Sequence, residues 1–278
     1  VEYIRDFNLS CDRVFAIISS KEFKKEKFGK TKLKNINGDF EFKNVSFSYG
    51  KVKVLKDLSF NVKANETVAF VGKSGAGKTT IFNLLCKMYD ADKGKIMIDG
   101  VDIKKLDKDS IRGNITVISQ SPYIFNVSIK DNLKLVKRDM TDEEMIDACK
   151  MACLDDFINS LPEKYDTIVG EGGINLSGGQ KQRLAIARAL VQKTEIILFD
   201  EATSALDNET QEKIQKAINN MKNEYTILII AHRLSTIVGA DRILFLNDGK
   251  IECEGSHEYL LKNCPDYKKL YEAEITKN

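Results

Sequence analysis

The chain has 278 residues, of which 42% are hydrophobic and 30% charged, a composition typical of a globular protein with a sizeable core. Its 43 Lys and Arg nearly balance its 41 Asp and Glu, and a net charge of +2 argues against attraction of the whole surface to nucleic acid. The sequence contains no apolar run of the roughly 18 residues that a membrane helix needs, and no signal peptide.

The six cysteines form neither a metal-ligand pattern nor a disulfide framework. Cys149 and Cys153 are four residues apart, but no His and no second Cys pair accompanies them. We therefore expect small buried or half-buried side chains in a reducing cytosol.

Residues 1–20 predict an amphipathic helix, because apolar residues recur at helical spacing at Ile4, Phe7, Cys11, Val14, Phe15 and Ile18. The helix either lies on the surface of the domain or is the end of a helix that continues upstream. The chain begins with Val1 rather than Met, which favours a piece of a longer protein whose missing part lies upstream. The Lys-rich residues 21–38 predict a solvated linker, with contact to anionic lipid as an alternative.

Strands are predicted from Phe40 onward. Phe40 and Phe42 alternate in one phase and Val45, Phe47 and Tyr49 in the other, which indicates a bulge or bend between them. Further strands are expected at Leu58–Val62, Thr67–Val71, Lys95–Ile98, Ile196–Phe199 and Thr226–Ile230, with a late hairpin of Ile243–Leu246 and Lys250–Glu252.

Helices are predicted at Lys78–Tyr89, 141–161 and 180–192. The first should bury Ile81, Leu84, Leu85 and Met88. The alternation of strands and helices favours an α/β fold with a parallel central sheet. We expect an antiparallel β subdomain near 39–66 and 94–104 and a helical subdomain near 121–188, all within a domain that spans 39–278.

A phosphate-binding loop follows the strand Thr67–Val71. The run Gly72-Lys73-Ser74-Gly75-Ala76-Gly77-Lys78-Thr79 matches G-x-x-x-x-G-K-[ST] and opens a helix. Its glycines allow backbone N–H groups to turn onto phosphate oxygens, and the helix N-terminus adds partial positive charge. Lys78 should reach the β- and γ-phosphates, and Thr79 offers a hydroxyl to Mg²⁺.

Two carboxylates end the apolar strand Ile196–Phe199. Asp200 stands where ligands bind in open α/β sheets and should orient Mg²⁺ through water. Glu201 follows and can activate the attacking water as a general base.

A second loop, Leu176-Ser177-Gly178-Gly179-Gln180, opens the next predicted helix. Ser177 and Gln180 have the spacing of a capping box, so a well-capped helix is the simplest interpretation. That interpretation leaves unexplained the two glycines, which cost helix stability and allow an anion to approach the backbone.

In combination these motifs resemble the nucleotide-binding domain of ATP-binding cassette transporters, and of exporters in particular. The resemblance covers about residues 39–275 and rests on Gly72–Thr79, Gln120, Leu176–Gln180, Asp200-Glu201, Ser204-Ala205-Leu206-Asp207 and Ala231-His232-Arg233. The runs Ser121–Phe125, Ser128–Leu133 and Gly170–Gly173 resemble the exporter subgroup.

The resemblance implies a role for each matching residue. Tyr49 would stack on the adenine of ATP, with core packing as its alternative, and Val54 and Thr80 would complete the nucleotide contacts. Gln120 would contact Mg²⁺ or the lytic water, and His232 would hold the γ-phosphate, the water and Glu201 in register. His257 has no such context, and we interpret it as structural.

The resemblance also implies partners. Ser177, Gly178, Gly179 and Gln180 would face the γ-phosphate bound to a second copy of the domain, and Asp207 would contact the opposite phosphate loop. Two Mg-ATP would then lie in a head-to-tail homodimer on the cytoplasmic face of a membrane. Their hydrolysis would power transport of an unknown substrate, in the export direction, by a transmembrane domain fused upstream. No nucleic-acid partner is expected.

The sequence departs from the usual pattern at Ile168, where an acidic residue is common, and at Gly172, where an Arg is common. Two other functions compete with a transporter ATPase: a soluble cassette ATPase that acts on nucleic acid or ribosomes, and a regulatory nucleotide-binding module that does not hydrolyse ATP. The single cassette opposes the first of these, and Glu201 and His232 oppose the second.

Overall fold

The computed structural model describes residues 2–19, 26–33, 36–200, 208–231 and 237–275. Its centre is a six-stranded sheet in the order β12-β11-β3-β10-β9-β6, in which only β12 runs antiparallel to its neighbour. The strands are β3 (Thr67–Val71), β6 (Ile115–Ile118), β9 (Ile196–Asp200), β10 (Thr226–Ile230), β11 (Arg242–Asn247) and β12 (Lys250–Gly255). The predicted parallel core is confirmed, whereas β6 was not predicted.

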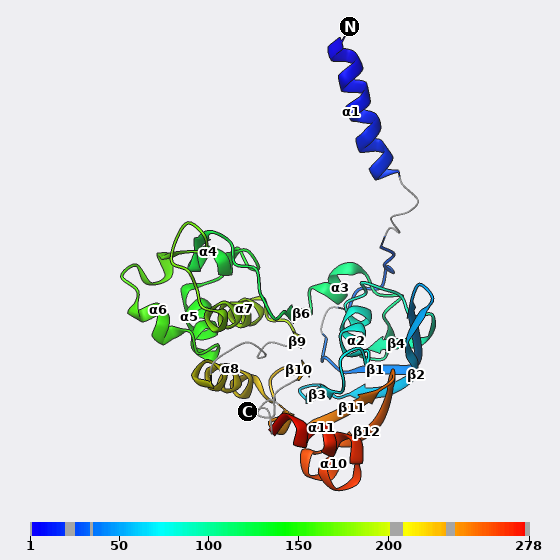
Figure 1. Ribbon diagram of the computed structural model, residues 1–278. Helices are drawn as coiled ribbons and strands as arrows, with labels where there is room; N and C mark the ends of the chain where they lie inside the picture. Colours follow the sequence, from blue (N-terminus) through cyan, green and yellow to red (C-terminus); the bar gives the residue numbers. More distant parts are fainter. Residues whose placement is uncertain (1, 20–25, 34–35, 201–207, 232–236, 276–278) are drawn as a thin grey trace.

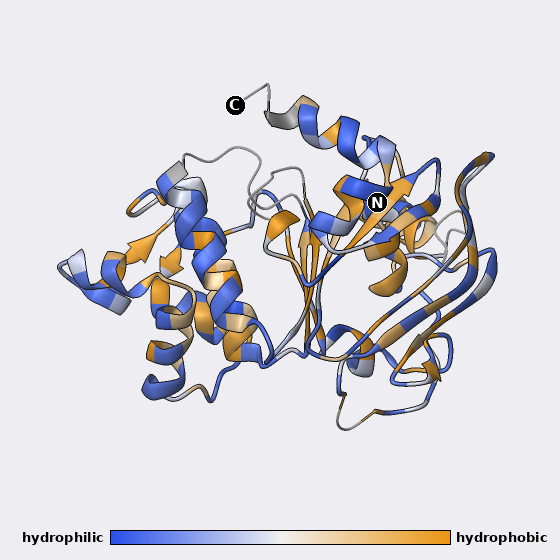
Figure 2. Cartoon of the chain, turned by 90° about the horizontal axis from the view of Figure 1, so that it is seen from below, coloured by the Kyte–Doolittle hydropathy of each residue, from blue (hydrophilic) through white to orange (hydrophobic). Residues whose placement is uncertain are grey.

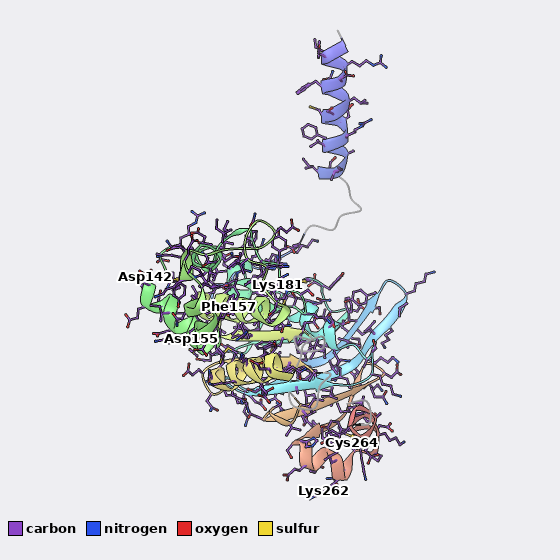
Figure 3. All side chains as sticks on the ribbon, turned by 60° about the vertical axis from the view of Figure 1, so that its left-hand side comes forward. Asp142, Asp155, Phe157, Lys181, Lys262 and Cys264 are labelled. Carbon is purple, nitrogen blue, oxygen red and sulfur yellow. A yellow bond between two sulfur atoms is a disulfide. The ribbon has the colours of Figure 1, made fainter. Side chains whose placement is uncertain are left out.

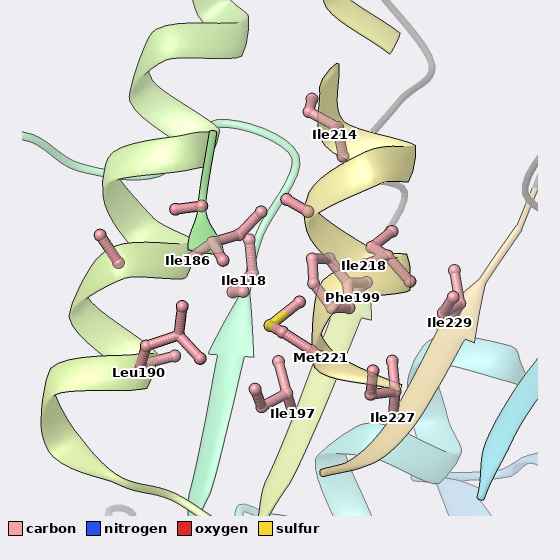
Figure 4. Close-up of a cluster of buried hydrophobic side chains, with 14 of the residues drawn as sticks. Ile118, Ile186, Leu190, Ile197, Phe199, Ile214, Ile218, Met221, Ile227 and Ile229 are labelled. Atoms are coloured by element: carbon pink, nitrogen blue, oxygen red, sulfur yellow. The ribbon is translucent and has the colours of Figure 1, made fainter. Parts of the chain in front are cut away.

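Both faces of this sheet are buried, because alternate side chains of each central strand enter different cores. On β9, Ile197 and Phe199 join the core beneath helices α7 (Gly178–Gln192) and α8 (Asn208–Met221), whereas Ile196 and Leu198 join the core on the other face. Figure 4 shows the first of these cores, in which Leu190 of α7 and Met221 of α8 lie beside the strand side chains Ile197 and Phe199. Burial on both faces explains why these strands read as continuous apolar runs.

A second sheet of four antiparallel strands has the order β2-β1-β4-β5. It is formed by β1 (Phe40–Tyr49), β2 (Val52–Val62), β4 (Lys93–Ile98) and β5 (Val101–Asp102), as predicted for the antiparallel subdomain. The β1–β2 register shifts between Phe42 and Val45, so the expected bulge is confirmed. Helix α2 (Lys78–Leu85) shares its core with this sheet, and α3 (Lys108–Arg112) leads from it into β6.

The segment between β6 and β9 is mainly helical and lies on the opposite side of the central sheet from the antiparallel sheet (Figure 1). It contains α4 (Ile129–Lys134), α5 (Asp142–Met151), α6 (Asp155–Ser160), the short 3-10 helix η1 (Lys164–Asp166) and α7, with a small ribbon of β7 (Val127–Ser128) and β8 (Ile168–Val169). Apolar residues concentrate on the inner sides of these elements (Figure 2).

Two predicted helices are shorter than expected. Helix α2 ends at Leu85 rather than Tyr89, and Met88 is 56% exposed instead of buried. Lys87 takes a left-handed φ of 55°, its N–H donates to Leu84 O, and Met88 N–H donates to Asn83 O, which is the Schellman arrangement that stops a helix.

The helix predicted over 141–161 is broken in the same way. Cys153 has a φ of 53° and donates its N–H to Lys150 O, and Leu154 N–H donates to Cys149 O. The result is two helices, α5 and α6, joined by a left-handed residue.

At the amino-terminal end, α1 (Glu2–Ile18) stands apart from the rest of the chain (Figure 1). Its apolar side chains are exposed, and Ile4, Phe7 and Phe15 each expose more than 60% of their surface. The structure therefore disagrees with the first of the two predicted alternatives, in which this helix lies on the surface of the domain. None of the helices in the described ranges is both long and apolar enough to cross a membrane.

Residues 26–33, part of the predicted solvated linker, are largely exposed but also form hydrogen bonds with the folded domain. Gly29 N–H donates to Leu106 O at 2.7 Å and Thr31 N–H to Lys105 O at 2.9 Å. Arg112 pairs with Glu26 and lies 5.2 Å above the Phe28 ring. The backbone thus docks beside α3 as part of the folded domain, because these contacts depend on residues about 80 positions away.

The expectation of unpaired cysteines is also wrong at one place. Cys253 of β12 and Cys264 form a disulfide with a Cα–Cα distance of 6.3 Å. Cys264 caps helix α10 (His257–Asn263) just before α11 (Pro265–Ile275), and it is labelled near the lower edge of Figure 3. Cys86 and Cys149 are buried, and Cys11 and Cys153 are half-buried, as expected.

Candidate functional site

The phosphate loop joins β3 to α2 and has the backbone that its glycines permit. Gly72, Gly75 and Gly77 all have positive φ, at 155°, 80° and 101°. A Cβ on Gly72 would lie 2.2 Å from Leu246 O, and one on Gly77 would lie 2.6 Å from Leu55 Cδ2. These two positions therefore need glycine for space as well as for conformation.

Gly77 is the N-cap of α2 and makes no side-chain capping hydrogen bond. The first N–H groups of the helix, which normally need a cap, therefore have no side-chain partner at that position. Such a helix start suits an anion held by backbone N–H groups.

Lys78, the first residue of α2, lies folded along the loop. Its Nζ donates to Gly72 O at 2.8 Å and to Lys73 O at 3.0 Å, and the residue is 5% exposed. The ammonium group of Lys78 is thus held against the loop whose bound phosphates it is predicted to contact.

Asp200 and Gln120 follow neighbouring strands at the same edge of the sheet. In the register of the parallel strands, Asp200 pairs with Ile230, and Ile230 pairs with Phe70, two residues before the phosphate loop. Gln120 lies two residues beyond the end of β6, the strand beside β9. Its backbone carbonyl accepts a hydrogen bond from Gln182 Nε2 at 3.1 Å.

A hollow of about 260 Å³ lies over the phosphate loop. It is lined by Tyr49, Val54, Ser74, Gly75, Gly77, Lys78, Thr79 and Thr80. Eight predicted nucleotide contacts, from β1, β2, the phosphate loop and α2, therefore come together at one place. Tyr49 is 38% exposed at this rim, which disfavours the alternative that it is a core residue.

A larger hollow of about 470 Å³ lies on the other side of Gly72, Lys73 and Ser74. Strand β11 and helix α11 supply apolar side chains, such as Phe245 and Leu270, and also the polar Asn247, Asp266 and Lys269. Size alone does not identify the site here, because Tyr49, Val54 and the residues Lys78 and Thr79 border the smaller hollow and not the larger.

The second glycine loop caps α7 as predicted. Ser177 Oγ accepts a hydrogen bond from Gln180 N–H at 3.3 Å, and Gln180 Oε1 accepts one from Ser177 N–H at 2.8 Å. A Cβ on Gly179 would lie 1.9 Å from Thr210 Cγ2, so packing against α8 also requires this glycine. The described walls of the hollow over the phosphate loop do not include this loop.

Arg183 is a buried side chain of α7 that forms hydrogen bonds near the start of this helix. Its Nε donates to Gly179 O at 3.3 Å and its Nη1 to Cys153 O at 2.5 Å. Burial lowers the pKa of the Arg183 guanidinium from its usual value. The side chain thus ties the glycine loop to the end of α5.

Some predicted residues lie outside the described part of the chain. They are Glu201, Ser204–Asp207, His232 and Arg233. His257 is described, and its Nδ1 lies 2.7 Å from the Tyr267 hydroxyl while its ring contacts Tyr271. These contacts agree with the structural role expected for His257.

The contacts of Gly172 give a local reason for glycine at this position, where an Arg is common in the family that the sequence resembles. Gly172 N–H donates to Asn126 Oδ1 at 3.1 Å, and a Cβ at Gly172 would lie 2.6 Å from Asn126 Nδ2. A larger residue there would have to displace Asn126. Ile168, the other departure, is 51% exposed on β8.

Two neighbours of the hollow were not predicted. Asn83 of α2 and Tyr89 both contact Tyr49. The only signal in the sequence was their position just after the phosphate loop, and it does not show which strand they meet.

The strand, glycine loop and helix around this hollow define a P-loop nucleotide-binding protein of the α/β class. Residues 55–204 match the family model described as ABC transporter. The chain belongs to the ABC transporter family.

Similar proteins extend the match beyond that segment. The chain is 44% identical to an ATP-dependent lipid A-core flippase of Haemophilus influenzae, over 96% of this chain and 46% of the flippase. It is 45% identical to the Beta-(1-->2)glucan export ATP-binding/permease protein NdvA of Rhizobium johnstonii, over 90% of this chain and 43% of that protein. The chain thus spans less than half the length of these relatives.

A solved structure has the same fold. It is described as a bacterial Atm1-family ABC exporter with ATP bound, and it superposes with a TM-score of 0.88 at 38% identity. The match covers 98% of this chain and 48% of that exporter chain.

Proposed function

We propose that this chain binds and hydrolyses Mg-ATP as the nucleotide-binding part of an exporter, and that two copies close around two ATP molecules. The observation that carries the proposal is the hollow where Tyr49, Val54 and the phosphate loop meet, at the same sheet edge as Asp200, which ends the strand two places away in the sheet. The names of the similar proteins support export, but the substrate stays open because their other half is absent from this chain.

The residues present fit a nucleotide triphosphate and its metal. The glycine backbone and the start of α2 present N–H groups where phosphate oxygens would lie, and Lys78 supplies positive charge. Thr79 and Asp200 offer the hydroxyl and carboxylate oxygens that Mg²⁺ prefers, and Gln120 offers an amide oxygen at the same edge. Bound Mg²⁺ would neutralise charge on the phosphates.

In the proposed reaction, Glu201 orients the attacking water and accepts its proton, and His232 holds the water and the γ-phosphate in line. Ser177, Gly179 and Gln180 act across the dimer on the γ-phosphate bound to the other copy, with Asp207 against the opposite phosphate loop. ATP would favour the closed dimer and product release the open one, because only ATP carries the γ-phosphate that both copies contact.

The partner and the location follow from the same proposal. Helix α1, whose apolar side chains are exposed in the described part of the chain, would be the continuation of a transmembrane domain fused upstream (Figure 3). The chain would then work at the cytoplasmic face of a membrane. A soluble ATPase that acts on nucleic acid is not favoured, because the similar proteins are exporters and flippases.

The test is calorimetric titration of Mg-ATP into the wild-type chain, Lys78→Ala and Lys63→Ala. Lys63 is an exposed lysine before β3, at the opposite edge of the sheet, and serves as the matched control. Loss of a charged hydrogen-bond donor should weaken binding about 10- to 100-fold in Lys78→Ala. Equal affinities for the three proteins would contradict the proposed phosphate site.

A further inference from the structure

Tyr49, the ring at the rim of the hollow, lies in a group of three aromatic side chains. The centroid of Phe47 is 4.8 Å from that of Tyr49 with the planes at 90°, and the centroid of Tyr89 is 5.1 Å away with the planes at 89°. Phe47 and Tyr89 are themselves 5.5 Å apart. Each ring therefore contacts both others in the perpendicular or tilted geometry that aromatic pairs favour.

A hydrogen bond fixes the far end of the same ring. Asn83 Nδ2 donates to the Tyr49 hydroxyl at 3.2 Å. Asn83 lies on α2, five residues after Lys78, so this bond ties the aromatic rim to the helix that carries the phosphate loop.

Tyr89 is held in position by the end of α2. The left-handed turn at Lys87 stops the helix, and Lys87 pairs with Asp90, on the other side of Tyr89 in the chain. Had α2 continued to Tyr89, this ring would have followed the helix surface instead of the turn. The early helix end thus contributes to the contact with Tyr49.

The three rings differ in burial, and this difference distinguishes a ring that supports Tyr49 from a ring that only packs in the core. Phe47 is 4% exposed and belongs to the core, whereas Tyr49 is 38% and Tyr89 46% exposed. Tyr49 also ends β1 at a tight turn, where Gly50 has a φ of 60°. A ring in such a place would sample several orientations unless its neighbours restricted it.

We propose that Tyr89 and Asn83 are positioning residues that hold Tyr49 in the orientation that meets the base of a bound nucleotide. The inference rests on the proposed function, in which Tyr49 contacts the base. Tyr89 and Asn83 act through Tyr49: they order its ring before binding, so that less conformational freedom is lost when the base arrives.

The experiment measures the affinity of the chain for Mg-ATP and for inorganic tripolyphosphate, which carries the phosphates without a base. The variants are Tyr49→Ala, Tyr89→Leu, Asn83→Leu, Tyr89→Phe and the double variant Tyr49→Ala/Tyr89→Leu. Tyr259→Leu, which changes an exposed tyrosine of α10, is the matched control.

We expect Tyr89→Leu and Asn83→Leu to weaken ATP binding about three- to tenfold, the cost of ordering one side chain on binding. Tripolyphosphate binding should not change in any of these variants, and Tyr89→Phe, which keeps the ring, should restore the affinity for ATP. The double variant should bind ATP as Tyr49→Ala does, because Tyr89 has no separate effect once Tyr49 is gone.

Three results would overturn the inference while leaving the nucleotide site intact. They are unchanged ATP affinity in Tyr89→Leu and Asn83→Leu, an equal loss of tripolyphosphate affinity, and full additivity in the double variant. If Tyr49→Ala itself leaves ATP binding unchanged, the base contact in the proposed function fails, and the inference fails with it.

Discussion

At the scale of single residues, the phosphate loop depends on glycines whose space is filled by distant parts of the chain. At Gly77, Leu55 of β2 occupies the place that a Cβ would take. The sequence motif explains this glycine by the backbone conformation of the loop. The structure adds a second reason, which is the close approach of β2.

Gly77→Ala should therefore destabilise the protein and weaken nucleotide binding. The left-handed φ of 101° costs an alanine about 1–2 kcal/mol, and the 2.6 Å contact with Leu55 adds to that. Chemical denaturation should show the loss, with Gly50→Ala as the control for φ alone, since no atom lies within 4 Å of a Cβ there. Equal losses in both variants would contradict the role of Leu55.

Residue roles could be predicted where a local motif carries them, and not where tertiary contacts do. The phosphate loop and the Ser177–Gln180 capping box are local patterns, and the structure has both. The contacts of Asn83 and Tyr89 with Tyr49 join α2 to β1 across more than 30 residues, and no spacing in the sequence encodes them.

At the scale of elements, the helix ends were the least predictable feature. Lys87 and Cys153 occupy left-handed positions where glycine is usual, so no residue type at either place signals the end of a helix. The strands were easier, because runs such as Thr226–Ile230 are apolar throughout and bounded by polar residues.

The disulfide between β12 and the end of α10 should stabilise the carboxyl-terminal part of the chain. Cys253 and Cys264 are 11 residues apart, and closing a loop of this length contributes about 3 kcal/mol in the chain-entropy description. Denaturation with and without a reductant should show a loss of about this size. Cys253→Ser should be insensitive to the reductant, and a wild-type protein that is equally insensitive would contradict the link.

Glu144 should give helix α5 a pH-dependent stability. Hydrogen bonds from Lys137, then from Lys193 and from the Thr141 N–H, lower the pKa of Glu144 from 4.5 to about 2. Because the folded pKa is the lower one, the stabilisation is complete above pH 4.5 and is lost as the pH falls towards 2.

Glu144→Gln keeps the capping geometry and removes the charge, so its melting temperature should fall below that of the wild type at pH 7. The difference should shrink as the pH is lowered from 4.5 towards 2. Glu143→Gln removes a charge from the same helical turn and serves as the control. A wild-type advantage that stays constant down to pH 2 would contradict the assigned pKa.

At the scale of the whole molecule, the alternation of strands and helices was enough to predict an α/β fold with a parallel sheet, and the family match agrees. The docking of residues 26–33 beside α3 was not predictable, because their lysines suggest solvent while backbone hydrogen bonds make the contact. The sequence likewise could not place Asp200 level with the residues before the phosphate loop, which only the strand order does.

The proposed function requires two copies of this chain to hydrolyse ATP together. The most direct measurement is the rate of ATP turnover as a function of protein concentration, for the wild type and for Glu201→Gln. We expect Mg²⁺-dependent hydrolysis that rises faster than linearly with concentration, almost no turnover in the variant, and a dimer of the variant on a sizing column only when ATP is present. Turnover that is strictly proportional to concentration and unaffected by the substitution would contradict both the paired site and the role of Glu201.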